Sequence, residues 1–191
     1  GRRPGAPGVS ARRRLDLEMI RRGLVSGRTE ASEVIGAGRV TVDGAPADKA
    51  SRLVAPGQAV VVAGPPARYV GRGGRKLEAA LEGFGLDPTG LRAVDVGSST
   101  GGFTDCLLQY GAASVVAVDV GRGQLHRRLG DDDRVEVHER TNVRGVDAGS
   151  LGAPFDLLTC DLSFISLRTV MADLVGLVAV GAPMVLLAKP Q

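Results

Sequence analysis

The stretch VDVGSSTGGFTD, at positions 94–105, has the clearest chemical character in the chain, because a short apolar run ends at Asp95 and opens into small residues. Gly97, Gly101 and Gly102 allow a ligand to approach the main chain closely, and a helix beginning after them offers unpaired N–H groups. The spacing matches neither G-x-G-x-x-G nor a loop that ends in G-K-[ST]. A dinucleotide fingerprint and a phosphate-binding P-loop are therefore disfavoured.

A second acidic residue, Asp119, ends the next apolar run, 24 residues after Asp95. An acid at the end of a second strand is well placed to accept hydrogen bonds from ribose hydroxyls. A neutral or cationic nucleoside ligand would use such an acid, and because it carries no phosphate it would not require a lysine in the glycine-rich loop. S-adenosylmethionine fits this description, and a purely structural tight turn is the alternative.

The residues around this loop alternate between strand and helix patterns. A helix is predicted at GGFTDCLLQYG, and strands are predicted at LRAVDVG, ASVVAVDVG, RVEVHE, FDLLTCDLSF and APMVLLAKP. Such alternation predicts an α/β fold with a Rossmann-like, doubly wound parallel sheet. Ligands of these sheets bind at the carboxyl ends of the strands beside the switch point, where GSSTGG falls.

The chain before residue 64 follows a different pattern. Two short amphipathic helices, the second capped by Ser26 or Thr29, precede an Asp43-Gly44 hairpin and a further strand, QAVVVAG. This predicts a small α+β domain over 12–63 after a basic, flexible N-terminus over 1–11. The Gly-, Pro- and Arg-rich residues 64–75 read as a linker. A methyl-donor-binding domain over 76–191 would begin with a helix whose Leu77, Leu81 and Phe84 share one face.

Charge is distributed unevenly between these two parts. Residues 1–76 hold 15 Lys and Arg against 6 Asp and Glu, a net charge of +9, whereas residues 77–191 hold 9 against 15, a net charge of −6. A basic part joined to an acidic part predicts that the first meets a polyanion. Aromatic residues make up only 3% of the chain, so a stacking platform for bases is disfavoured.

Several other classes of protein are disfavoured as well. Cys106 and Cys160 match neither a disulfide framework nor a metal-ligand spacing, and His126 and His138 lack partners at such a spacing, so no metal is expected. The basic start is followed by no apolar region typical of a secretory signal. The most apolar segment, 174–188, is too short and too broken by Gly and Pro to span a bilayer. We expect a cytoplasmic protein without membrane insertion.

The segment RRRLDLEMIRRGLVSGRTEASEVIGAGRVTVDG resembles the S4-like RNA-binding domain, a helix-loop-helix followed by a hairpin. In that family the paired helices present arginines to structured RNA, and guanidinium groups suit phosphate because they donate two hydrogen bonds in a fixed plane. The resemblance implies an RNA-binding set by position: Arg12, Arg13, Arg14, Arg21, Arg22, Arg28 and Arg39. For any single member, a solvated helix face is the alternative.

Several further motifs together resemble the TlyA family from about Arg12 to the last residue: YVGRGGRKLEAALEGF, VDVGSSTGGFTDCLLQYGA, VVAVDVGRGQL, ERTNVR, CDLSFISL and LLAKPQ. The resemblance implies a class I S-adenosylmethionine-dependent methyltransferase of the FtsJ-like type behind an S4-like domain. The implied activity is methylation of the ribose 2′-OH of cytidines in 16S and 23S rRNA, with ribosomal subunits as partners.

The resemblance also implies roles for single residues. The family's Lys-Asp-Lys-Glu catalytic set aligns with Lys76, Asp161 and Lys189, with Lys189 nearest the hydroxyl and Asp161 orienting it. The implied donor-binding set is Asp95, Gly97, Ser98, Thr100, Gly101, Gly102, Phe103, Asp119 and Asn142, the last at the adenine edge. DLSF in place of an Asn/Asp-Pro-Pro-aromatic motif disfavours methylation of base nitrogens.

The chain stops at Gln191, before the family's last strands and its catalytic glutamate, so we expect a truncated methyltransferase domain. Two other functions stay open at this point. One is a non-catalytic module for ribosome binding or assembly with a methyltransferase fold, and the other is haemolysis, an activity attached to the family's name.

Overall fold

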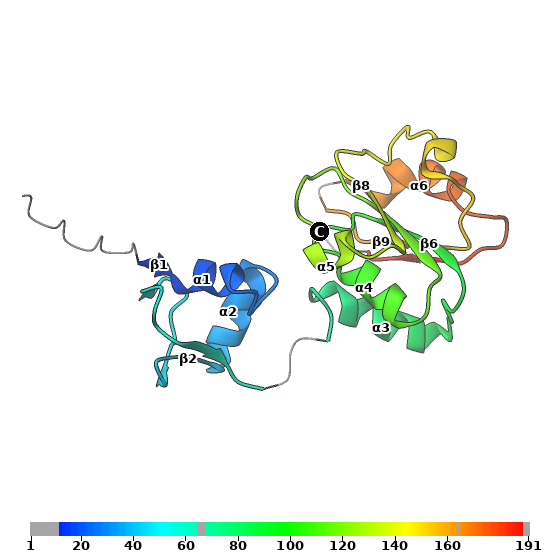
Figure 1. Cartoon of the computed structure of the whole chain (residues 1–191). Helices are drawn as coiled ribbons and strands as arrows, with labels where there is room; N and C mark the ends of the chain where they lie inside the picture. Colours follow the sequence, from blue (N-terminus) through cyan, green and yellow to red (C-terminus); the bar gives the residue numbers. More distant parts are fainter. Residues whose placement is uncertain (1–11, 65–67, 164, 189–191) are drawn as a thin grey trace, which may run out of the picture. The chain divides into compact units, whose positions relative to one another are not determined.

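The chain divides into two units, Gly1–Pro66 with one core of buried apolar side chains and Ala67–Gln191 with two such cores. The structure is a computed structural model that describes residues 12–64, 68–163 and 165–188. Figure 1 shows the small helical and stranded first unit and the larger second unit built around one sheet.

The first unit packs two short helices against short strands. Its elements are β1 (Arg13–Arg14), α1 (Leu15–Arg21), α2 (Arg28–Gly36), β2 (Val40–Val42), β3 (Ala45–Pro46), β4 (Leu53–Val54) and β5 (Val60–Val62). Strand β2 pairs antiparallel with both β3 and β5, and β1 pairs with β4. Leu15 and Met19 of α1 are fully buried in the core. The predicted hairpin turn is confirmed, because Asp43 and Gly44 both have positive φ, 51° and 78°.

The predicted caps of the second helix are wrong. Gly27 takes the N-cap position of α2 in extended backbone, without a side-chain hydrogen bond to the helix. Ser26 instead donates from both its backbone N and its Oγ to Glu30 Oε2, at 2.6 and 2.5 Å. The start of α2 is therefore held by Glu30, in its first turn, which accepts from the residue before the N-cap.

The second unit is a five-stranded sheet in which all neighbouring strands run parallel. Its order is β10-β9-β6-β7-β8. The strands are β6 (Arg92–Val96), β7 (Ser114–Val118), β8 (Val135–His138), β9 (Leu157–Cys160) and β10 (Met184–Leu186). The chain moves outward from β6 in one direction through β7 and β8 and then in the other through β9 and β10. The switch point therefore lies between β6 and β9, and the predicted doubly wound parallel fold is confirmed.

Helices cover both faces of this sheet (Figure 1). They are α3 (Gly73–Phe84), α4 (Gly102–Gln109), α5 (Arg127–Gly130), the 3₁₀ turn η1 (Ala148–Leu151) and α6 (Leu167–Gly176). Because side chains alternate along a strand, Ala93 of β6 packs in the core with α3 and α4, while its neighbour Val94 packs in the core with α6. Cys106 and Cys160 are buried free thiols in these two cores. No helix within the described residues is long and apolar enough to cross a membrane.

Two details at the start of this unit differ from the expectation. Phe84 is 74% exposed, because Gly85 ends α3 in the left-handed conformation and Leu86, which follows, packs against the core instead. Residues 68–72, expected in the linker, belong to the packed unit: Tyr69 and Val70 are buried, and Val70 N donates to Asp105 Oδ2 at 2.8 Å. The composition of this stretch correctly predicted a loop, but it did not show that the loop is packed against the rest of the unit.

The starts of α3 and α4 approach so closely that a side chain cannot fit at Gly102. A Cβ there would lie 2.9 Å from Gly74 N and 3.2 Å from Gly73 Cα, both of them main-chain atoms. We expect Gly102→Ala to lower the free energy of unfolding by about 1–3 kcal/mol, because the two helices must separate. Chemical denaturation monitored by circular dichroism measures the change.

Gly83→Ala is the matched control, since Gly83 is also a helical glycine, in α3, but a Cβ there would have no neighbour within 4 Å. Replacing an exposed helical glycine by alanine should raise stability by about 0.5–1 kcal/mol. Equal effects of the two substitutions would show that the close approach of the helices is not what requires Gly102.

Candidate functional site

The glycine-rich turn between β6 and α4 lies at the switch point of the sheet. Gly97 has a φ of 83°, and a Cβ on it would lie 2.8 Å from the carbonyl oxygen of Asp161, at the end of β9. On the other side, the N–H groups of Gly97 and Ser98 both donate to the carbonyl of Val118, at 2.8 and 3.2 Å. The turn is therefore wedged between the ends of β9 and β7, and only glycine fits its first position.

Asp119, directly after β7, ties this turn to the next loop. Its Oδ2 accepts from Ser99 N and its Oδ1 from Gly121 N, each at 2.7 Å. Ser99 has a φ of 47°, which is unusual for a residue other than glycine and is held by this hydrogen bond. Each carboxylate oxygen keeps a second lone pair for a ligand hydroxyl. The sequence predicted that Asp119 belongs to the site but not that Ser99 does, because a serine gives no sign in the sequence that its backbone will take a positive φ.

Asp95 lies inside the fold rather than at the surface of the turn. Its side chain is fully buried and accepts from Thr104 N and Oγ1, at 3.0 and 2.7 Å, and from Thr159 Oγ1 at 3.2 Å. Burial raises the pKa of Asp95 to about 6, although the threonine hydrogen bonds act in the opposite direction. The carboxyl thus holds the first residues of α4 against β6 and β9. It affects the glycine-rich turn only indirectly, through the position of α4.

A cavity of about 190 Å³ opens above the turn. Six residues of the predicted sets line it together: Gly97, Ser98, Thr100, Gly102 and Phe103 of the donor-binding set and Asp161 of the catalytic set. Its wall also contains Gly73, Ser99 and Ser163, which sequence reasoning did not single out. Ser99 could have been predicted from the sequence, because it lies between two residues of the predicted donor-binding set. Gly73 could not, because it is brought to the cavity only when α3 packs beside the glycine turn.

The start of α3 closes one side of the cavity. The backbone at Gly71 and Gly73 lies against Thr100 and Phe103, since a Cβ at these glycines would be 2.8 Å from Thr100 Oγ1 and 3.3 Å from a ring carbon of Phe103. Lys76 is exposed on the next turn of α3. The structure thus brings the element that carries Lys76 beside the cavity, but the lysine is not among the residues that line it.

The remaining predicted residues are Asp161, whose place in the cavity wall is given above, Asn142 and Lys189. Asp161 follows β9, and its charge adds to the rise in the pKa of Asp95. Asn142 is exposed and accepts from Arg144 N at 3.0 Å, while its neighbour Thr141 donates to the carbonyl of Asp119 at 2.9 Å. Asn142 therefore lies one residue beyond a contact with the Asp119 loop. Lys189 lies outside the described residues.

The arginines of the first unit are organised by two buried carboxylates. Glu18 is 1% exposed and accepts from Arg21 and Arg22, and these hydrogen bonds, that of Arg21 first, lower its pKa to about 2. Asp16, also buried, pairs with Arg14 at 2.9 Å and with Arg28 at 3.5 Å. Both acids hold guanidinium groups in fixed planes on the outside of α1.

These arginines differ in how far they reach solvent. Arg14, Arg21 and Arg28 keep 42%, 51% and 66% of their side chains exposed. Arg22 keeps only 20% and also donates to the carbonyls of Gln58 and Pro56, so it braces α1 against the loop before β5. Arg39 donates to the carbonyl of Ala63, and Arg12 and Arg13 are exposed.

Family models match both units. The FtsJ-like methyltransferase model matches residues 69–191, and the S4 domain model matches residues 13–60. These matches follow the division between the sheet unit and the small helical unit.

Named relatives are similar over most of the chain. It is 49% identical to the 16S/23S rRNA (cytidine-2'-O)-methyltransferase TlyA of Mycobacterium tuberculosis over 184 residues, a match that covers 96% of this chain and 69% of that protein. It is 36% identical over 159 residues to Hemolysin A of Brachyspira hyodysenteriae, covering 82% of this chain and 65% of that protein. A solved structure titled "Putative hemolysin from Streptococcus thermophilus" is 37% identical, with a TM-score of 0.70 over 95% of this chain and 67% of that one.

The predicted resemblance is thereby confirmed in both units, by the family models, by the identity over nearly the whole chain and by the shared fold. The chain belongs to the TlyA family, in which an S4 domain precedes an FtsJ-like methyltransferase domain.

Proposed function

We propose that this chain is an S-adenosylmethionine-dependent rRNA methyltransferase that methylates the ribose 2′-OH of cytidines in 16S and 23S rRNA. The observation that carries the proposal is the cavity at the switch point, where the glycine turn faces Asp161. The identity of 49% to a relative named for this activity supports the choice of substrate. Cytoplasmic location follows from such a substrate and agrees with the two free thiols.

The residues around the cavity fit S-adenosylmethionine. The turn presents main-chain groups at Gly97 and Gly102, where close approach of the backbone has excluded side chains. Asp119 offers the remaining lone pairs of its carboxylate to the ribose hydroxyls, and Asn142 lies beyond it for the adenine edge. The turn contains no lysine, in keeping with a ligand that carries no phosphate. When bound, this donor supplies an electrophilic methyl group on a sulfonium.

The acceptor hydroxyl needs alignment and a group that takes its proton. A ribose hydroxyl is a weak nucleophile, so the chain must hold it in line and accept the proton as the new carbon–oxygen bond forms. We assign the proton to Lys189 and the orientation of that lysine to Asp161, which lines the cavity. Lys76, exposed on α3 beside the cavity, assists or contacts an RNA phosphate. A neutral Lys189 amine would take the hydroxyl proton as the carbon–oxygen bond forms, while the bond between the methyl carbon and sulfur breaks and its electron pair stays on sulfur in the S-adenosylhomocysteine that leaves.

The first unit supplies the contacts to rRNA. Arg12, Arg13, Arg14, Arg21 and Arg28 reach solvent, and the ion pairs to Asp16 and Glu18 pre-orient three of them for phosphate. Arg22 serves the fold instead. RNA affinity and stability of the unit therefore depend on different arginines.

The donor assignment predicts that the chain binds S-adenosylmethionine and that Asp119→Ala weakens binding by about tenfold or more. The substitution removes a charged acceptor from the ligand and the restraint on Ser99, and a hydrogen bond to a charged group is worth about 1.5–3 kcal/mol. Isothermal titration calorimetry measures the affinity, with the exposed Asp133→Ala as control. A wild-type chain that gives no heat with the donor would refute the assignment.

The catalytic assignment predicts that Lys189→Ala abolishes methyl transfer while rRNA binding is retained. Ribosomal subunits from cells that lack the gene are incubated with the protein and radiolabelled donor, and nucleosides are then separated to detect 2′-O-methylcytidine. Retained methylation would contradict the role of Lys189. Normal ribosome assembly in cells that carry only the inactive variant would favour the alternative of a non-catalytic ribosome-binding module.

The division among the arginines predicts opposite phenotypes for Arg13→Ala and Arg22→Ala. Arg13→Ala should weaken binding to ribosomal subunits and reduce the slope of log affinity against log salt by about one, with an unchanged melting temperature. Arg22→Ala should lower the melting temperature of the first unit, because Glu18 and two carbonyls lose a partner. Co-sedimentation across a salt series and thermal unfolding separate the two; a stable Arg22→Ala variant would contradict the bracing role.

A further inference from the structure

The segment after β7, residues 121–130, lies across the glycine turn and is here named the strap. His126 N donates to the carbonyl of Thr100 at 3.1 Å. The space that a Cβ on Gly101 would need is occupied by Leu125 Cδ1 and Leu129 Cδ1. The strap thus fixes the second half of the turn, just as Asp119 fixes the first half.

The strap has little structure of its own. Its helix, α5, has four residues, and a single turn is not stable in isolation. Its start is capped only locally, where His126 Nδ1 accepts from Arg128 N at 3.2 Å. Arg127 pairs with Asp131 on the same turn, but both side chains are well exposed, so this pair contributes little. The strap therefore depends on contacts to the rest of the unit.

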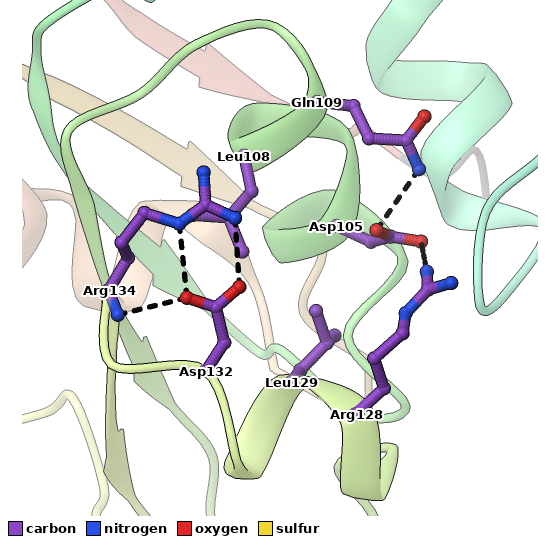
Figure 2. A pocket seen from close by; sticks show the side chains of 7 residues that line it. All are labelled: Asp105, Leu108, Gln109, Arg128, Leu129, Asp132 and Arg134. Carbon is purple, nitrogen blue, oxygen red and sulfur yellow. Dashed lines mark hydrogen bonds and ion pairs between the residues drawn. The ribbon is translucent and has the colours of Figure 1, made fainter.

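One of these contacts joins α5 to α4. Arg128 Nη2 donates to Asp105 Oδ2 at 2.7 Å, and Figure 2 shows the guanidinium reaching from α5 toward the carboxylate on α4. Asp105 is 4% exposed and is itself held by Val70 N and by Gln109 Nε2, at 2.8 and 3.1 Å. Asp105 is a fixed acceptor. The Arg128 side chain is 59% exposed, but its partner is buried, so this pair is stronger than the pair of Arg127 with Asp131, in which both side chains are exposed.

A cavity of about 380 Å³ lies beside this ion pair (Figure 2). Leu108 and Leu129 supply its apolar lining. A second pair, Arg134 with Asp132, also lines it and joins a residue two positions after the strap to the residue before β8. Leu129 of α5 is buried in the same core as Leu107 and Leu108 of α4, and beside the cavity Arg128 adds a charged hydrogen bond between the two helices.

We propose that Arg128 is a positioning residue for the methyl donor: by fastening the strap to Asp105 it keeps Leu125, His126 and Leu129 against the glycine turn. This inference rests on the proposed donor site. Without the ion pair, the turn would occupy its binding-competent conformation for a smaller fraction of the time, and the apparent affinity would fall by that fraction. The rate of methyl transfer at saturating donor should not change, because Arg128 touches no reacting group.

Calorimetric titration of S-adenosylmethionine into the 191-residue chain tests this with three variants. We expect Arg128→Ala to raise the dissociation constant about three- to tenfold, and Arg128→Lys to recover part of the loss, since it restores the charge without the planar fork. Arg127→Ala is the matched control, from the same turn of α5 but 91% exposed. Equal dissociation constants for Arg128→Ala and Arg127→Ala would overturn the proposal.

Amide hydrogen exchange without donor separates positioning from general loss of stability. Faster exchange in Arg128→Ala confined to residues 97–101 and 121–130 supports the strap, whereas faster exchange throughout the sheet unit would reduce Arg128 to a structural role and overturn the proposal. If the wild-type chain failed to bind the donor, the proposed function would fail, but this exchange pattern would still decide whether Arg128 orders the turn.

Discussion

The second unit depends on the close approach of three main-chain segments at the carboxyl edge of its sheet. The turn after β6 touches the carbonyl of Asp161 through Gly97 and the start of α3 through Gly102. A side chain at either glycine would push β9 or α3 outward and would open the cavity. Glycine at a fixed position costs about 0.5–1 kcal/mol in chain entropy, and burial of α3 and α4 against the sheet offsets that cost. Three of the residues that line the cavity are glycines, Gly73, Gly97 and Gly102, whose backbone groups cannot move as long side chains can.

Three aspartates near this edge have the same chemistry and three different tasks, set by their surroundings. Asp95 is buried and saturated by threonines, so it holds α4 in place. Asp119 follows β7 and ties two loops through Ser99 N and Gly121 N, and its carboxylate oxygens keep lone pairs for a ligand. Asp161 lines the cavity beside Gly97. Of the three, it is the one that the proposed mechanism assigns to the acceptor side.

Sequence patterns were sufficient for the architecture because strand and helix periods are local properties. The alternation of strand and helix patterns along the chain predicted the doubly wound sheet, and that sheet in turn predicted where the glycine turn would lie. The inward direction of Asp95 could not be predicted, because the donors that satisfy it, Thr104 and Thr159, come from elements that meet only in the fold. The structural role of Arg22 could not be told from the RNA-binding role predicted for the nearby arginines for a similar reason, because its carbonyl partners are more than 30 residues away in sequence.

The strained backbone at Ser99 shows how this edge is prepared for a ligand. A non-glycine residue at positive φ costs about 1–3 kcal/mol and persists only where its surroundings fix it. Here the carbonyl of Val118 holds the residues before it, Asp119 holds its own N–H, and the strap holds Thr100 and Gly101 after it. All three ties come from β7 or from the chain that follows it. Since Asp119 is also the proposed acceptor for the ribose, one carboxylate orders the turn and recognises the ligand. A turn that is ordered before the donor arrives loses less conformational freedom on binding, and more of the contact energy is left for affinity.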